Sequence, residues 1–202
     1  MTQLLVGAFV TISSTLFVAE LTDKDALLLL TLATRERAVT VFLAGATAFV
    51  ATTTLFVSAG TLLITTIPLI WIKLFGGSFM LGYALWQLRW VVGGKEDTKG
   101  GAGERVERRL NGLKAFFAVV GALALLDMAG DATEILTVVL VAQYSDIILV
   151  FLAACTGLIA ATAVETALGN RLGKVLTPRR LLYFSTAVFL ALGTWIIASG
   201  LG

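Results

Sequence analysis

Residues 3–33 have the sequence QLLVGAFVTISSTLFVAELTDKDALLLLTLA, a long apolar run with an acidic cluster, Glu20 to Asp25, in its middle. A helix needs ~20 apolar residues to cross a bilayer, and this run exceeds that length. The acids lie far from both of its ends, where insertion scales assign each charge a cost of about 2.5–3.5 kcal/mol. The stretch therefore predicts a membrane helix that carries functional carboxylates near the bilayer midplane.

The composition of the whole chain supports a membrane protein. Of its 202 residues, 58% are hydrophobic and only 14% are charged, and the mean hydropathy is +0.95. A soluble domain of this size needs more polar side chains to cover its surface, whereas lipid solvates apolar ones directly. The single cysteine, Cys155, excludes a disulfide framework. We expect an integral membrane protein with little mass outside the bilayer.

Six segments are long and apolar enough to span the bilayer: 3–33, 38–66, 69–91, 113–143, 147–169 and 181–200. They lack the alternating polarity of barrel strands, so the predicted fold is all-α. The first segment has neither a basic leader nor a small-residue cleavage site and is expected to be a retained helix. The first and fourth segments are the longest, so we expect them to be kinked or broken at their acidic residues, near Glu20–Asp23 and Gly130–Asp131.

The basic residues predict an orientation. Thirteen of the 15 Lys and Arg residues lie in or beside the first, third and fifth connections between the predicted spans. The positive-inside rule makes these odd-numbered connections cytoplasmic and leaves both termini outside. The expected location is the plasma or inner membrane of a prokaryote.

The two halves of the chain resemble each other at a nearly constant offset. Phe42–Thr47 (FLAGAT) matches Phe151–Thr156 (FLAACT), and Pro68 matches Pro178. Three spans per half would insert the second copy upside down, giving two inverted repeats with a binding site at their interface. The predicted units are a first three-helix repeat at 1–92, a cytoplasmic linker at 93–112 and a second three-helix repeat at 113–202.

Each half carries carboxylates with helical spacing. Glu20 and Asp23 are three residues apart, and Asp127, Asp131 and Glu134 follow at intervals of four and three. Each set lies on one face of a helix, and the two faces are expected to meet in one central site. Oxygen ligands suit hard cations such as Ca²⁺, Mg²⁺ and Mn²⁺, and the lack of histidine argues against a dedicated Zn²⁺ or Cu⁺ site.

The candidate metal ligands are Glu20, Asp23, Asp127 and Asp131, with Thr22, Asp25, Thr133 and Glu134 as additional candidates. On a continuous helix Asp25 lies about 200° around the axis from Asp23, so its amide variant should be milder. Glu165 comes shortly before Arg171, and we expect it near the cytoplasmic interface, where its amide variant should be close to silent.

At these residues the sequence resembles the GDT-type cation:proton exchangers, the family of the Golgi manganese/calcium transporter. Members carry a Glu-x-Gly-Asp-(Lys/Arg)-(Ser/Thr) motif on the first and fourth spans. The first copy here is Glu20-Leu21-Thr22-Asp23-Lys24-Asp25, in which Thr22 replaces the glycine and Asp25 the final hydroxyl residue. In the second copy Asp127 replaces the glutamate, one extra residue precedes Gly130-Asp131, and Thr133 keeps the hydroxyl.

The resemblance and the buried acids predict a secondary antiporter that exchanges Mn²⁺ or Ca²⁺ for protons, with the cation as cargo and no prosthetic group. No ATP-binding motif is present, so a gradient must drive transport. The alternatives are a small-solute, amino-acid or cadmium exporter of the related lysine-exporter-like superfamily. An intramembrane aspartyl protease and a scaffold fit less well, so no enzyme activity is expected. The expected partners are the ion, protons and lipid, without nucleic acid, and homo-oligomers stay open.

Overall fold

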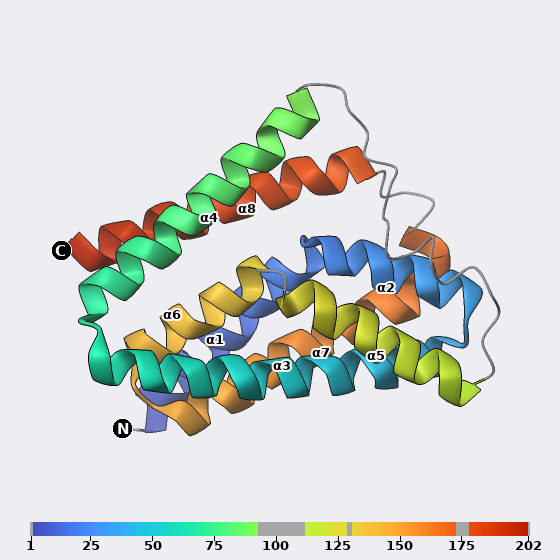
Figure 1. The fold of residues 1–202 in the computed structure, drawn as a ribbon, viewed down its shortest axis with the longest axis horizontal. Helices are drawn as coiled ribbons and strands as arrows, with labels where there is room; N and C mark the ends of the chain where they lie inside the picture. Colours follow the sequence, from blue (N-terminus) through green and yellow to red (C-terminus); the bar gives the residue numbers. More distant parts are fainter. Residues whose placement is uncertain (1, 93–111, 129–130, 173–177, 202) are drawn as a thin grey trace.

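The computed structural model describes residues 2–92, 112–128, 131–172 and 178–201, and the regular structure within these ranges is entirely helical (Figure 1). The helices are α1 (Thr2–Leu21), α2 (Lys24–Arg35), α3 (Ala38–Thr66), α4 (Leu69–Val92), α5 (Gly112–Met128), α6 (Ala132–Tyr144), α7 (Ile147–Leu172) and α8 (Pro178–Leu201). The prediction of an all-α fold is confirmed. The predicted linker at 93–112 lies outside the described residues except for Gly112, where α5 begins.

Five of these helices, α1, α3, α4, α7 and α8, are long and apolar enough to cross a membrane. Large apolar side chains also cover the outside of the molecule. Leu4 is 80% exposed, Leu113 is 73% exposed and Phe75 is 70% exposed. In water such a surface would aggregate, whereas in lipid it is the favoured boundary.

The first and fourth predicted spans are both interrupted. The first is divided into α1 and α2 after Leu21, and the fourth is divided into α5 and α6 after Met128. The helix ends coincide with the two acidic clusters, as the sequence predicts. Each of α5 and α6 is shorter than a full span, so the fourth segment crosses the molecule as two pieces.

Helices from the two halves of the chain pack against each other throughout the molecule. α7 contacts α1, α2 and α3, while α3 also contacts α5 and α6. α4 and α8 form a closely packed pair, which Figure 1 shows along one side of the remaining helices. The breaks between α1 and α2 and between α5 and α6 therefore lie within a bundle built from both halves.

Glycines permit the closest of these approaches. A Cβ at Gly157 of α7 would overlap the backbone oxygen of Ser13 and would lie 3.2 Å from the backbone nitrogen of Phe17 on α1. A Cβ at Gly77 of α4 would lie 2.9 Å from the carbonyl oxygen of Gly193 on α8. Small residues at helix interfaces are the usual means of bringing membrane helices into close contact.

We expect Gly157→Ala to destabilise the protein, because the added methyl group collides with the α1 backbone, which cannot move aside as a flexible side chain can. Overpacking of this kind costs about 1–3 kcal/mol. Thermal unfolding of the detergent-purified protein measures the effect. Gly121→Ala is the matched control, since a Cβ there meets nothing within 4 Å. Equal melting temperatures for the two variants would contradict the close α1–α7 packing.

Candidate metal centre

The first break is stabilised by the backbone and by Thr22. The Thr22 N–H donates to the carbonyl oxygen of Ala19 at 3.1 Å, and the Asp23 N–H donates to that of Glu20 at 3.0 Å. These bonds reach back three residues instead of four and tighten the last turn of α1. The Thr22 hydroxyl also donates to Ala19 at 2.8 Å. α2 then begins with Asp25 in its first turn, where the helix dipole favours a negative charge.

The second break uses a capping carboxylate. Asp131 is the N-cap residue of α6, and its side chain accepts a hydrogen bond from the backbone N–H of Ala132 at 2.7 Å. Aspartate is among the preferred residues at this position because it satisfies a free N–H of the first turn. Glu134 lies in the same first turn and accepts a 3.5 Å hydrogen bond from the hydroxyl of Thr133.

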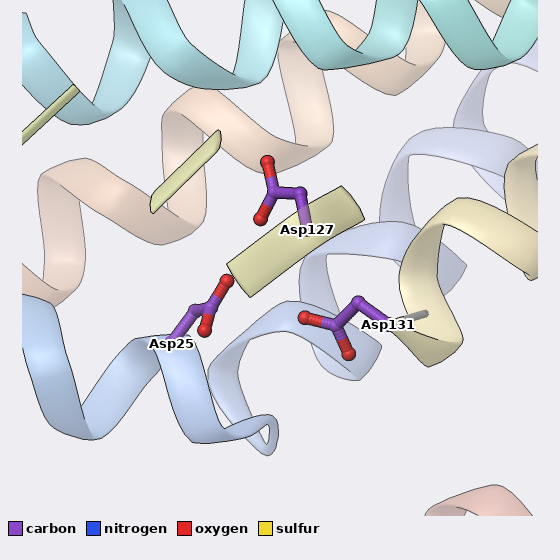
Figure 2. Close-up of side chains that lie close together, drawn as sticks. All are labelled: Asp25, Asp127 and Asp131. Atoms are coloured by element: carbon purple, nitrogen blue, oxygen red, sulfur yellow. The ribbon is translucent and has the colours of Figure 1, made fainter. Parts of the chain in front are cut away.

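Three aspartates from the two breaks meet in one place (Figure 2). Asp25 of α2, Asp127 of α5 and Asp131 at the start of α6 each provide a carboxylate oxygen, and these oxygens lie within 4.8 Å of one another. All three side chains are 0% exposed. Three oxygens at this spacing from three separate chain segments can bind one metal ion, which would neutralise charges that otherwise repel.

Asp23 lies at the edge of this group and forms a hydrogen bond with a residue of α4. Its Oδ1 accepts a 3.2 Å hydrogen bond from the hydroxyl of Tyr83 on α4. The Tyr83 ring packs edge-on against Phe189 of α8, with ring centroids 5.4 Å apart. The α4–α8 pair is thereby connected to the first acidic cluster, and sequence reasoning had not identified Tyr83, because one tyrosine in an apolar span gives no signal of its own.

Glu20, in the last turn of α1, is 0% exposed, and neither of its carboxylate oxygens has a hydrogen-bond partner among the described residues. The charges of Asp25, Asp131 and Asp23 act on it, so it borders the aspartate group. A buried carboxylate without a donor is costly, and binding a cation would remove that cost.

The candidate ligands of the sequence analysis therefore divide into those that the structure groups and those that it does not. Asp127 and Asp131 lie in the three-aspartate cluster, while Glu20 and Asp23 border it. Glu134 is buried but is not one of the three clustered carboxylates, and the side chains of Thr22 and Thr133 are buried as well. The sequence analysis placed Asp25 about 200° around the helix axis from Asp23, on the assumption of a continuous helix. The helix stops between Leu21 and Lys24, so this angle does not apply, and Asp25 lies in the cluster.

Glu165 also has a different environment from the one predicted near the interface. Its side chain is 1% exposed, and its charge acts on Glu20. The sequence contains a signal for this: Gly157, Ala161, Glu165 and Gly169 recur every four residues, so the acid lies on a face of small residues. Such a face packs closely against neighbouring helices.

The helical fold, the apolar exterior and the buried acids at two helix breaks define an integral membrane transport protein. The family model described as "Divalent cation/proton antiporter GDT1" matches residues 8–94 and 115–202, and the chain belongs to this family. The predicted family is thus confirmed, and its members are transporters and not enzymes. Comparison with curated proteins and with solved structures gives no match.

The cluster predicts that Asp25→Asn impairs transport as severely as Asp127→Asn or Asp131→Asn, by at least tenfold. Each change keeps the shape of the side chain and removes one of three converging charges, and asparagine at position 131 still caps α6. Metal-dependent flux, normalised to the amount of protein in the membrane, measures the effect.

Glu36→Gln, in the connection between α2 and α3, is the matched control and should transport normally. Normal transport by Asp25→Asn alongside an inactive Asp23→Asn would contradict the three-aspartate centre. It would favour instead the interpretation in which Asp25 points away from Asp23 on a continuous helix.

Proposed function

We propose that this chain exchanges Mn²⁺ or Ca²⁺ for protons and that the cation binds at Asp25, Asp127 and Asp131, with Glu20 and Asp23 beside them. The observation that carries the proposal is the convergence of these three aspartates from helix breaks in both halves of the chain. Membership of the divalent cation/proton antiporter family supports the reaction, and the buried oxygen ligands support the position of the site.

The chemistry of the cluster favours a hard divalent cation. Mn²⁺ and Ca²⁺ accept carboxylate oxygens readily, and Ca²⁺ in particular tolerates irregular geometry and water as additional ligands. The C-terminal ends of α1 and α5 adjoin the cluster, and carbonyl groups at such ends attract cations in broken transporter helices. A single ammonium group, by contrast, would not need this many carboxylates.

Carboxylates also suit the exchange with protons, since the same oxygens bind either a metal ion or a proton. In this mechanism protons that reach the aspartates displace the cation, and the cation displaces them again from the other side of the membrane. An alternating-access motion that exposes the site first to one side of the membrane and then to the other couples cation transport to proton transport. The bond between Tyr83 and Asp23 gives the α4–α8 pair a direct connection to the site during such a motion.

Two inverted three-helix repeats, 1–92 and 113–202, are the architecture that we propose for this motion. The helix contacts support it: α1 and α2 contact α7, whereas their counterparts α5 and α6 contact α3. The family model matches two segments that correspond to the two proposed repeats.

The proposed orientation has both termini outside and the odd-numbered connections in the cytoplasm. Both termini lie toward the same end of the long axis in Figure 1, and the α2–α3 connection lies toward the opposite end. This arrangement agrees with the distribution of Lys and Arg, thirteen of which flank the odd-numbered connections.

Reconstituted proteoliposomes test the function directly. We expect Mn²⁺ or Ca²⁺ gradients to drive proton movement in the opposite direction, recorded with an internal pH dye, and Asp127→Asn to abolish it. Parallel assays with Mg²⁺, Cd²⁺ and lysine establish the substrate. Proton flux with lysine or Cd²⁺ alone would favour an exporter of the lysine-exporter-like superfamily and overturn the Mn²⁺/Ca²⁺ proposal.

Competition between protons and metal for the same oxygens predicts a pH dependence of binding. The apparent affinity for Mn²⁺ should be higher at pH 8 than at pH 5.5, because carboxylates must lose their protons before they bind a metal ion. Titration calorimetry on the detergent-purified protein at both pH values measures this affinity. Identical affinities would exclude direct competition at the carboxylates.

A further inference from the structure

Glu165 of α7 and Glu20 of α1 form a pair of buried carboxylates beside the aspartate cluster. Glu165 is 1% exposed and Glu20 is 0% exposed. All four carboxylate oxygens lack a hydrogen-bond partner among the described residues. Buried polar atoms are almost always satisfied in folded proteins, so these four oxygens point to a ligand that they bind.

Helix packing brings the two side chains to the same level. Gly157 of α7 lies against Ser13 of α1, and Gly169 lies against α2, where its Cβ would be 3.2 Å from the carbonyl oxygen of Leu30. α7 therefore runs in the same direction as α1 and α2. Glu165 lies between the two glycines, which places it opposite the break that follows Glu20.

Electrostatic interactions agree with this register. Among the charged groups that act on Glu20, Glu165 has the largest effect, ahead of Asp25, Asp131 and Asp23. The charges of Asp131, Asp127 and Asp23 act on Asp25. Glu20 thus interacts with both Glu165 and the aspartates.

We propose that Glu165 and Glu20 form a second binding position for the divalent cation, adjacent to the aspartate cluster. The inference rests on the proposed transport function and adds a residue of α7 to it. Two carboxylates carry the charge that balances one divalent ion, and they offer up to four oxygens, with water completing the coordination. Oxygen ligands of this kind accept Mn²⁺ or Ca²⁺ and discriminate against softer metals.

A second position has a clear use in transport. An ion held by three aspartates in a buried site dissociates slowly unless a neighbouring position can bind it. Channels avoid this problem by having several adjacent binding sites. Glu20 borders both positions, so it can keep contact with the ion as it moves between the aspartates and Glu165.

The test counts Mn²⁺ ions bound per chain by titration calorimetry on the detergent-purified protein. We expect two for the wild type, one for Glu165→Gln and two for Glu165→Asp, which keeps the carboxylate. Glu36→Gln is the matched control and should bind two. Thermal unfolding of each variant verifies that it is folded, and Mn²⁺ flux should fall at least tenfold in Glu165→Gln.

Two outcomes would overturn the inference while leaving the proposed function intact. One is a single Mn²⁺ in the wild type that disappears in Asp127→Asn. The other is a Glu165→Gln variant that still binds two ions, even if its transport is impaired, because Glu165 would then act otherwise than as a ligand. Failure of the proposed function is distinguishable, since Asp127→Asn would then bind and transport Mn²⁺ like the wild type.

Discussion

The burial of negative charge in a membrane protein is the constraint on which this structure depends. Seven carboxylates are at most 5% exposed: Glu20, Asp23, Asp25, Asp127, Asp131, Glu134 and Glu165. Lipid offers them no solvation, and an ordinary helix offers no free donors to its side chains. Helix ends do offer donors. The free N–H of Ala132 at the start of α6 donates to Asp131, and the start of α2 places Asp25 where the helix dipole also favours a negative charge.

Those helix ends in turn require the surrounding helices to seal them. Non-helical backbone is tolerated at membrane depth only where it is buried in protein or lines a water-filled cavity. α7 lies against the first break and α3 against the second, and both approach closely through small residues. Gly60 of α3 illustrates this, since a Cβ there would lie 3.2 Å from the Cβ of Val141 on α6. The charge, the breaks and the small residues therefore form one interdependent arrangement.

The sequence was sufficient to predict the helices and their interruptions. Hydropathy located α3 as 38–66, and the structure has Ala38–Thr66; the excess length of the first and fourth segments located the breaks. These features follow from local composition, which a single sequence reports directly. Asp127 and Asp131 were also identified correctly as neighbours, because both belong to one short motif beside one break.

Other parts of the site depend on information that the sequence lacks. The chain between Leu21 and Lys24 leaves the helix, so the direction of Asp25 depends on two non-helical residues and not on helical periodicity. The environment of Glu165 depends on which helix covers the small-residue face of α7. Tyr83 reaches Asp23 only because α4 pairs with α8, which in turn contacts α1. Each of these is a tertiary relationship between segments distant in the chain.

The exchanged contacts between the halves also have a consequence for how such a protein arises. α4 has its most extensive contacts with α8, and α1 has its most extensive contacts with α7, so the principal partners of these helices lie in the opposite half of the chain. The surfaces that hold the molecule together would be the same if each half were a separate polypeptide. Such a protein can originate as two short chains that assemble across a shared interface. A later gene fusion then joins two chains that already bind each other.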